Sequence, residues 1–277
     1  MAASYPTAVK SFSTKVDLAD SVLAAHVNDI QLEVSAIETE LGTSPKRGHA
    51  DVKTRLNAFD TGWIEISDTW TYASATTVTV PTDATTSYEK GYAVRFKQGG
   101  GYKYYYLTSP TATVLTLNGG SDYSVANSAI TNIAVAPAGH GVDFPYSFNY
   151  APTRAVSGGT VPTYTATDVT KFWMQGGVVW VQFTWINSAG GTAGAGANSI
   201  TFNLPVTATS TPYSTANSVL GFGHCYESAG TQTGIYISYN TTSTARFQAT
   251  GALANIVGND QSSTDRRLSG TFCYESA

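Results

Sequence analysis

The sequence has little charge and few cysteines, and these shortages exclude several classes of protein. Only 12% of its 277 residues are Asp, Glu, Lys or Arg, about half the roughly 25% usual in soluble domains. Fifteen basic residues and a net charge of −4 do not supply the positive surface that neutralises nucleic-acid phosphates. Cys225 and Cys273 are too few for a disulfide framework. We therefore expect no nucleic-acid partner.

Long apolar runs are also missing. No run of apolar residues reaches the ~18 that a membrane-spanning helix needs, so no membrane insertion is expected. The first residues, 1–6, lack the basic segment followed by an apolar one that marks a secretory signal. Without such a signal, a reducing compartment is expected for the two cysteines.

Hydroxyl side chains take the place of charge, and the charges that remain are unevenly distributed. The chain has 40 Thr and 27 Ser, about a quarter of all residues. Residues 1–60 carry 14 of the 34 charged side chains, and a Thr, Gly and Tyr-rich remainder follows. This change of composition near Gly62, with a Pro and Gly-rich linker at 145–162, predicts three domains: 1–60, 61–150 and 151–277.

The first domain is predicted to be helical. Between Ser21 and Gly42 the apolar residues are spaced 4, 3, 4, 3 and 4, which is heptad spacing: Leu23, Val27, Ile30, Val34, Ile37 and Leu41. Ser21 or Asp20 can cap the start of this helix, and Gly42 can end it. Isoleucine at the d positions favours trimers over dimers, so these six residues are expected to form an oligomerisation seam. Packing of the helix on its own protein's core is the alternative. A second short helix is expected around Val52, Leu56 and Phe59.

Beyond residue 61 the apolar period becomes two, which is typical of strands. Short strands separated by Gly, Asn, Asp and Pro are expected at 70–72, 77–80, 92–96, 102–106, 113–117, 130–135, 171–174, 178–186, 200–204, 219–226, 234–239, 245–249 and 268–274. The predicted fold is therefore mainly β. A short N-terminal helical (coiled-coil) anchor precedes two antiparallel β domains, the C-terminal one a β-sandwich or jelly-roll-like domain. The pentapeptide CYESA occurs at 225–229 and at 273–277, either in two equivalent strands or by coincidence.

Several segments carry a resemblance to a known family. The segments SFSTKVD (11–17), HVNDI (26–30), ETELG (38–42) and DVKTRL (51–56) resemble the N-terminal part of fibre-like and minor tail proteins of tailed bacteriophages. WTYASATTVTV (70–80) and GSDYSVAN (120–127) are similar to a β module of the same proteins. The Gly-Gly hairpin at 175–177, the Gly/Ala loop at 190–198 and the strand GTFCY (270–274) resemble distal fibre domains. The resemblance implies a trimeric virion appendage and leaves open whether it attaches to the tail or the head.

The residues show little sign of catalysis. The four histidines form no HExxH pattern, and His224–Cys225 has no accompanying CxxC pair, so no metal is expected. The Gly190–Gly196 loop lacks the Lys-Ser/Thr of a phosphate loop, so no cofactor is expected either. Most carboxylates of the β region fall at turns rather than in the paired arrangement that glycan hydrolysis needs. Residues 118–122 (NGGSD) are interpreted as a turn, with a calcium loop as the alternative.

A binding surface remains as the candidate site. Tyr102, Tyr104 and Tyr106 share one face of a strand and Tyr105 points the other way. Tyrosines stack on sugar rings while keeping a wet hydroxyl group. The alternative, which the pattern favours, is that this face of the strand is core. The tryptophans Trp173, Trp180 and Trp185 are expected in the core.

Together these observations predict a non-enzymatic structural virion protein. The expected form is a homotrimeric tail-associated fibre, whose residues 1–60 anchor it to another virion protein of the tail tip, baseplate or capsid. The C-terminal β domain is expected to contact the host surface, with a cell-surface glycan as a candidate ligand. A capsid head fibre or decoration protein is the alternative, and a polysaccharide-degrading spike is a more distant one.

Overall fold

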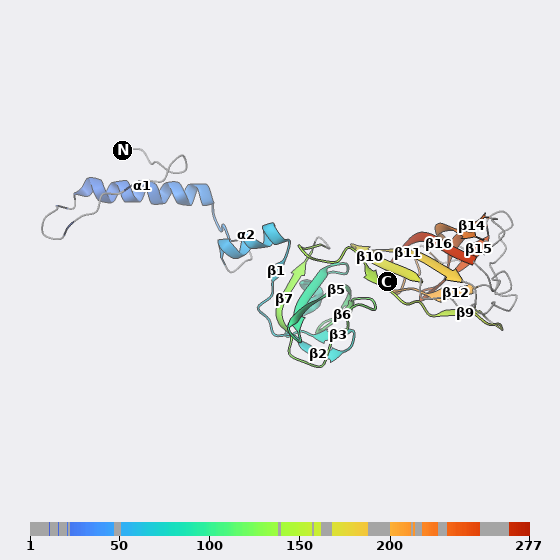
Figure 1. Cartoon of the computed structure of the whole chain (residues 1–277). Coiled ribbons are helices and arrows are strands. Elements are labelled where there is room, and N and C mark those ends of the chain that lie inside the picture. Colours follow the sequence, from blue (N-terminus) through green and yellow to red (C-terminus); the bar gives the residue numbers. More distant parts are fainter. Residues whose placement is uncertain are drawn as a thin grey trace. The chain divides into compact units, whose positions relative to one another are not determined.

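The computed structural model describes residues 11, 16, 21, 23–46, 51–137, 140–156, 158–161, 168–187, 200–211, 213, 218–226, 232–249 and 266–277. The chain divides into two compact units, residues 1–60 and 61–277. The first unit contains the helices, and the second contains two antiparallel sheets (Figure 1). The mainly β fold predicted from the sequence is confirmed. The Gly190–Gly196 loop lies outside the described residues.

Both predicted helices are present, as α1 (Ala24–Leu41) and α2 (Val52–Thr61). Helix α1 ends as predicted at Gly42, whose φ is 70° and whose N–H donates to the Glu38 carbonyl oxygen at 3.0 Å. A Ser21 cap is not found. The residue at the cap position is Leu23, and no side chain there accepts from the first turn. Instead, the Leu23 N–H donates to His26 Nδ1 at 3.2 Å.

Seven strands form the first sheet, in the order β1-β7-β4-β5-β6-β3-β2. Their bounds are β1 (Ile64–Glu65), β2 (Thr71–Ser74), β3 (Thr77–Thr79), β4 (Ala93–Gln98), β5 (Gly101–Pro110), β6 (Val114–Asn118) and β7 (Thr131–Ala136), with a 3₁₀ helix η1 at Ala84–Thr86. One face of the sheet covers a closed apolar core. In that core Tyr105 of β5 stacks on Phe96 of β4, with ring centroids 5.0 Å apart.

Nine strands form the second sheet, in the order β8-β10-β11-β16-β13-β14-β15-β12-β9. Their bounds are β8 (Phe148–Asn149), β9 (Arg154–Val156), β10 (Val169–Gln175), β11 (Val178–Asn187), β12 (Ile200–Asn203), β13 (Val219–Tyr226), β14 (Gln232–Thr241), β15 (Thr244–Ala249) and β16 (Arg266–Glu275). The thirteen strands expected from the alternation pattern are all present. The strands β1, β8 and β9, of two or three residues each, were not predicted, because so few residues cannot show an alternation.

The nine-stranded sheet curls back on itself. Its two edge strands, β8 and β9, are separated by only four residues in the chain. A flat sheet of nine strands would be about 38 Å wide at ~4.8 Å per strand, whereas five peptide steps reach at most about 18 Å. The ring contacts agree with this closure. Phe183 of β11 lies 5.5 Å from Phe247 of β15 and 6.4 Å from Phe202 of β12, measured between ring centroids.

The two sheets of the second unit share a hydrophobic core. Tyr106 of the seven-stranded sheet and Phe172 of the nine-stranded sheet belong to one buried cluster, together with Phe144 and Phe148. The nine-stranded sheet begins at Phe148, two residues before the boundary expected at residue 150. The two β regions therefore belong to one compact unit.

Side-chain parity corrects two expectations about the nine-stranded sheet. Trp180 and Trp185 are five residues apart on β11, so they point to opposite faces. Trp185 is fully buried, but Trp180 is 36% exposed and stacks on Trp173 outside the core. The two CYESA copies also differ. Cys225 and Tyr274 are buried while Tyr226 is exposed, so the copies do not occupy equivalent environments.

Candidate functional site

Within the part of the chain that the structure describes, the side chains of the predicted seam of helix α1 are exposed. The exposed fractions of its side chains range from 40% for Ile37 to 57% for Leu23, and the others are Val27, Ile30, Val34 and Leu41. Helical geometry places these residues along one stripe about 27 Å long. An apolar stripe of this kind is the feature by which helices associate.

The same helix is acidic. Its 18 residues include Asp29, Glu33, Glu38 and Glu40 and no Lys or Arg. In the predicted heptad, Glu38 and Glu40 fall at the e and g positions beside the seam. Any association through this stripe therefore brings carboxylates close to its edges.

The three candidate tyrosines do share one face of β5, opposite Tyr105 as predicted. In the register with β4, Tyr102 pairs with Lys97, Tyr104 with Arg95, and Tyr106 with Ala93. Tyr102 and Tyr104 are half-buried, and Tyr106 is fully buried.

Tyr106 is therefore corrected from a binding residue to a core residue. Its ring packs at 5.0–6.3 Å, between ring centroids, against Phe144, Phe148 and Phe172. Burial raises the pKa of its hydroxyl group to about 12. Only the end of the face that carries Tyr102 and Tyr104 remains accessible to a ligand.

Cationic side chains surround the accessible end. The Arg95 guanidinium lies 4.5 Å from the Trp63 ring centroid and 4.9 Å from that of Tyr102. The Lys97 ammonium group lies 4.8 Å from the same Tyr102 centroid. Burial raises the pKa of Tyr104, which also lies within the electrostatic reach of Arg95 and Asp143. Cation–π contacts of this kind orient a guanidinium without neutralising it.

A small pocket opens beside Arg95. Its volume is about 100 Å³, and Glu65, Tyr102 and Asn132 contribute polar groups to its wall. Glu65 and Asn132 are exposed. These residues come from four neighbouring strands, β1, β4, β5 and β7, so the sheet itself fixes their spacing. Of the residues that line this pocket, Tyr102 alone belongs to the predicted site, and the contribution of Arg95 became visible only from the cross-strand register.

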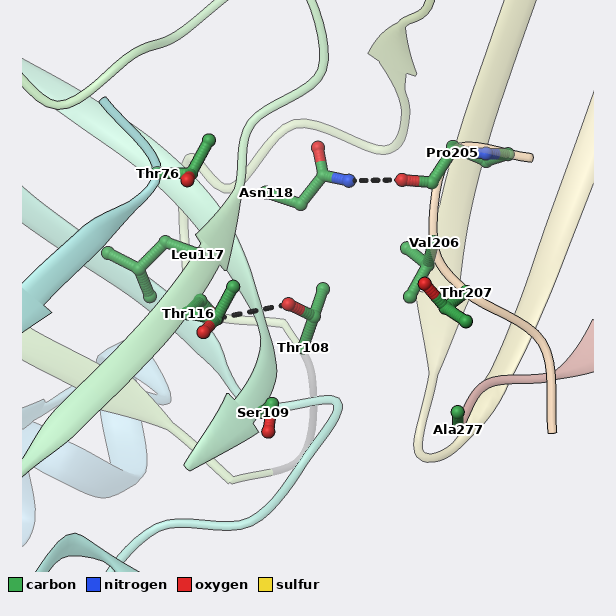
Figure 2. Close-up of a pocket in the computed structure, with 10 residues that line it drawn as sticks. All are labelled: Thr76, Thr108, Ser109, Thr116, Leu117, Asn118, Pro205, Val206, Thr207 and Ala277. Atoms are coloured by element: carbon green, nitrogen blue, oxygen red, sulfur yellow. Dashed lines mark hydrogen bonds between the residues drawn. The ribbon is translucent and has the colours of Figure 1, made fainter. Parts of the chain in front are cut away.

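A larger crevice of about 570 Å³ lies between the two sheets of the second unit (Figure 2). Six of its lining residues come from the seven-stranded sheet or its loops, and four come from the segment 205–207 and Ala277. Asn118 Nδ2 donates to the Pro205 carbonyl oxygen at 2.7 Å across it, and Thr108 Oγ1 donates to the Thr116 carbonyl oxygen at 3.1 Å. None of the ten lining residues has an ionisable side chain. The crevice can therefore offer hydrogen bonds but no side-chain acid or base.

The turn at 118–122 serves as a structural joint. Asp122 accepts hydrogen bonds from the backbone N–H and from Nδ2 of Asn149, both at 2.7 Å, and Asn118 Oδ1 accepts from the Gly120 N–H at 2.9 Å. The Asp122 carboxylate therefore binds Asn149 of β8. Within the described residues, no group of three or more His, Cys, Asp or Glu side chains is placed to hold a metal ion.

A second aromatic surface lies on the outer face of the nine-stranded sheet. Trp173 and Trp180 are directly opposite in the β10–β11 register, with ring centroids 6.1 Å apart and planes 4° apart. Phe222 of β13 is 65% exposed and contacts Tyr236. His224 is an exposed strand residue on β13, next to the buried Cys225.

Comparisons of the chain with protein-family models, curated proteins and solved structures found no match. Among the described residues, no helix combines the length and apolarity needed to cross a membrane.

Proposed function

We propose that the protein is a structural virion protein of a tailed bacteriophage, assembled as a homotrimeric tail-associated fibre without catalytic activity. Residues 1–60 anchor it to another virion protein of the tail tip, baseplate or capsid, and the β unit is displayed toward a glycan of the host surface. The observation that carries the proposal is the exposed heptad stripe of α1. It agrees with the resemblance of residues 11–56 to phage fibre proteins.

Self-association of the stripe is favoured because it buries apolar side chains. Fully burying an exposed Leu, Ile or Val side chain contributes about 1.5–3 kcal/mol, and the six seam residues are roughly half exposed. Association would then contribute on the order of 1 kcal/mol for each of them. Isoleucine at both inner d positions favours a three-stranded coiled coil. A helix this short is marginal alone, so the rest of the chain or the particle must support the trimer.

The β unit supplies the display end in this proposal, with the nine-stranded sheet as its sandwich or jelly-roll-like part. Its surface carries half-buried tyrosines next to cations and a crevice rich in hydroxyl groups. Such surfaces suit sugars, which combine apolar ring faces with many hydroxyl groups. A trimer presents three copies of any such site, so weak single contacts gain effective affinity when they bind together.

The assembly is tested by mass measurement of the full chain in native buffer, where three chains are expected. The double variant Ile30→Ser/Ile37→Ser should dissociate while the thermal transition of the β unit stays unchanged. Leu32→Ser is the matched control, because Leu32 is 42% exposed on the same helix but lies off the seam. A monomeric wild-type chain at micromolar concentration would contradict the trimer.

The attachment point is tested on the particle. Labelled antibody against the β unit should mark the tail tip. Labelling of the head would favour the capsid head fibre or decoration protein instead. Release of reducing ends from host polysaccharide would overturn the non-catalytic part of the proposal.

A further inference from the structure

Arg95 is held in an unusual state for a partly buried cation. Its side chain packs on Trp63 and Tyr102, and its Nε is buried. Among the residues that the structure describes, no oxygen atom accepts a hydrogen bond from this side chain and no carboxylate lies within ion-pair distance of it. The Nε–H does not reach the surface, but the two terminal nitrogens are not buried. They therefore keep their hydrogen-bonding capacity for an acceptor that comes from outside the chain.

The pocket beside Arg95 limits the size of that acceptor. Its volume of about 100 Å³ is smaller than a cavity of ~150 Å³ that holds one benzene ring. This space fits a carboxylate and the carbon that carries it, but not a complete sugar ring. The rest of the ligand must then lie outside, over the half-buried rings of Tyr102 and Tyr104.

The surrounding charges limit the charge of the ligand. Lys97 adds a second cation near Tyr102, while the Glu65 carboxylate lines the pocket itself and Asp143 lies near Tyr104. A dianion such as phosphate would be repelled by Glu65 more strongly than a monoanion. A carboxylate also matches the planar fork of arginine, which donates two parallel hydrogen bonds to it.

Two further groups favour a ligand that carries hydroxyl groups. The Glu65 carboxylate can only accept hydrogen bonds, and the Asn132 amide can both donate and accept. Both are exposed at the pocket wall. Asn132 has a positive φ of 51°, where the register between β4 and β7 shifts, a conformation that asparagine adopts more readily than most residues. A simple fatty carboxylate has no hydroxyl groups and would make no such hydrogen bond with either side chain.

From these contacts we propose that the Arg95 pocket binds the carboxylate of an acidic sugar, a hexuronate within a surface glycan. Arg95 binds the carboxylate, Glu65 and Asn132 bind the neighbouring hydroxyl groups, and Tyr102 supports the sugar ring. The proposal deepens the proposed glycan contact and names its ligand class, so its biological meaning rests on that function.

The proposal is tested on the full chain with a pair of ligands that differ only at C6, methyl β-glucuronide and methyl β-glucoside. Binding is measured by ligand-observed NMR at low and at moderate salt. The glucuronide should bind at least about tenfold more tightly than the glucoside. Equal binding of the two glycosides, or tighter binding of inorganic phosphate than of the glucuronide, would overturn the proposal. This comparison uses only the wild-type chain and does not depend on a variant that folds.

Variants then test whether the preference for the glucuronide arises in the Arg95 pocket. Arg95→Gln should abolish the preference for the glucuronide, and Glu65→Gln should weaken both glycosides. Lys171→Gln is the matched control, since it removes one positive charge from an exposed position on β10 of the other sheet, and its binding should equal that of the wild type. A trimer that does not bind the glucuronide would refute this inference alone. A monomer that binds the glucuronide would refute only the proposed trimer.

Discussion

Tyr106 of β5 packs edge-to-face on Phe148 of β8, with ring centroids 5.4 Å apart and ring planes at 84°. Both side chains are fully buried. Since β5 belongs to the seven-stranded sheet and β8 to the edge of the nine-stranded sheet, this contact joins the two sheets. Edge-to-face aromatic pairs contribute about 0.5–1.5 kcal/mol beyond the area they bury. The residue expected to bind a ligand is thus part of the joint between the sheets.

Removing Phe148 should destabilise the whole β unit. Phe148→Ala leaves a cavity beneath Tyr106 and should cost about 3–5 kcal/mol, measured by urea unfolding. Tyr146→Ala is the control, since Tyr146 is 90% exposed only two residues away, and it should stay within about 0.5 kcal/mol of the wild type. Equal costs for the two variants would show that the sheets do not share a core.

Two glycines with the same backbone angle offer a second test of the joint. Gly91 has φ 90° and Gly100 has φ 89°, so both positions disfavour alanine to a similar degree. A Cβ atom at Gly91 would lie 2.1 Å from the Gly176 carbonyl oxygen, in the turn between β10 and β11, whereas at Gly100 it would meet nothing within 4 Å. Gly91 therefore approaches the other sheet too closely for any side chain.

Gly91→Ala should then be clearly more destabilising than Gly100→Ala, by about 1–3 kcal/mol, the usual cost of overpacking. The measurement is the free energy of unfolding of each variant. The Gly100 variant serves as the control for backbone strain alone. Equal losses would mean that the contact between Gly91 and Gly176 is absent in solution.

The burial of Tyr106 should also be visible at high pH. Burial raises the pKa of its hydroxyl group from 10.0 to about 12. The folded state therefore holds this proton more tightly than the unfolded state. The resulting stability, about 2–3 kcal/mol by linkage, is fully present below pH 10 and is lost as the pH rises through about 12.

The readout is the near-ultraviolet absorbance of tyrosinate, titrated in the wild type and in Tyr106→Phe. The difference between the two curves should place the missing group near pH 12. A missing group that titrates near pH 10 would put Tyr106 at the surface and restore it as a binding residue.

The sequence pattern predicted the strands well and their burial less well, for a physical reason. Alternation along β5 correctly placed Tyr102, Tyr104 and Tyr106 on one face. Which end of that face is covered depends on Phe144, Phe148 and Phe172, and none of these long-range contacts follows from a period of two. The exposed apolar stripe of α1 was predicted from spacing alone, because one face of a helix repeats every three to four residues.

Arg95 is a second residue whose long-range contacts could not be predicted from the sequence pattern. On its own strand it reads as an ordinary polar residue between the buried Val94 and Phe96. Its importance comes from Trp63, which precedes β1, and from Tyr102 on β5. Only the pairing of β4 with β5 and β7 brings these residues together, and the two-residue strand β1 gave no pattern to predict it.

Salt should strengthen the self-association of α1. Glu38 and Glu40 are exposed beside the predicted seam, and the helix contains no Lys or Arg, so a trimer places like charges beside this seam. Salt screens such repulsion, since the Debye length falls from about 10 Å at 0.1 M to about 3 Å at 1 M. Sedimentation equilibrium should therefore show tighter trimers at high salt. Glu38→Gln/Glu40→Gln should reproduce this gain at low salt, by a few tenths of a kcal/mol for each repulsive pair removed.

The opposite salt dependence of self-association would be equally informative. If added salt dissociates the assembly, opposite charges hold it together, and the carboxylates of α1 must face cations that its 18 residues do not contain. The apolar stripe would then pack against a basic surface, either elsewhere on this chain or on the virion protein that anchors it. Thr39→Ala is the uncharged control in both cases. Its hydroxyl group donates to the Ser35 carbonyl oxygen within the same helix, so its loss should leave the salt dependence unchanged.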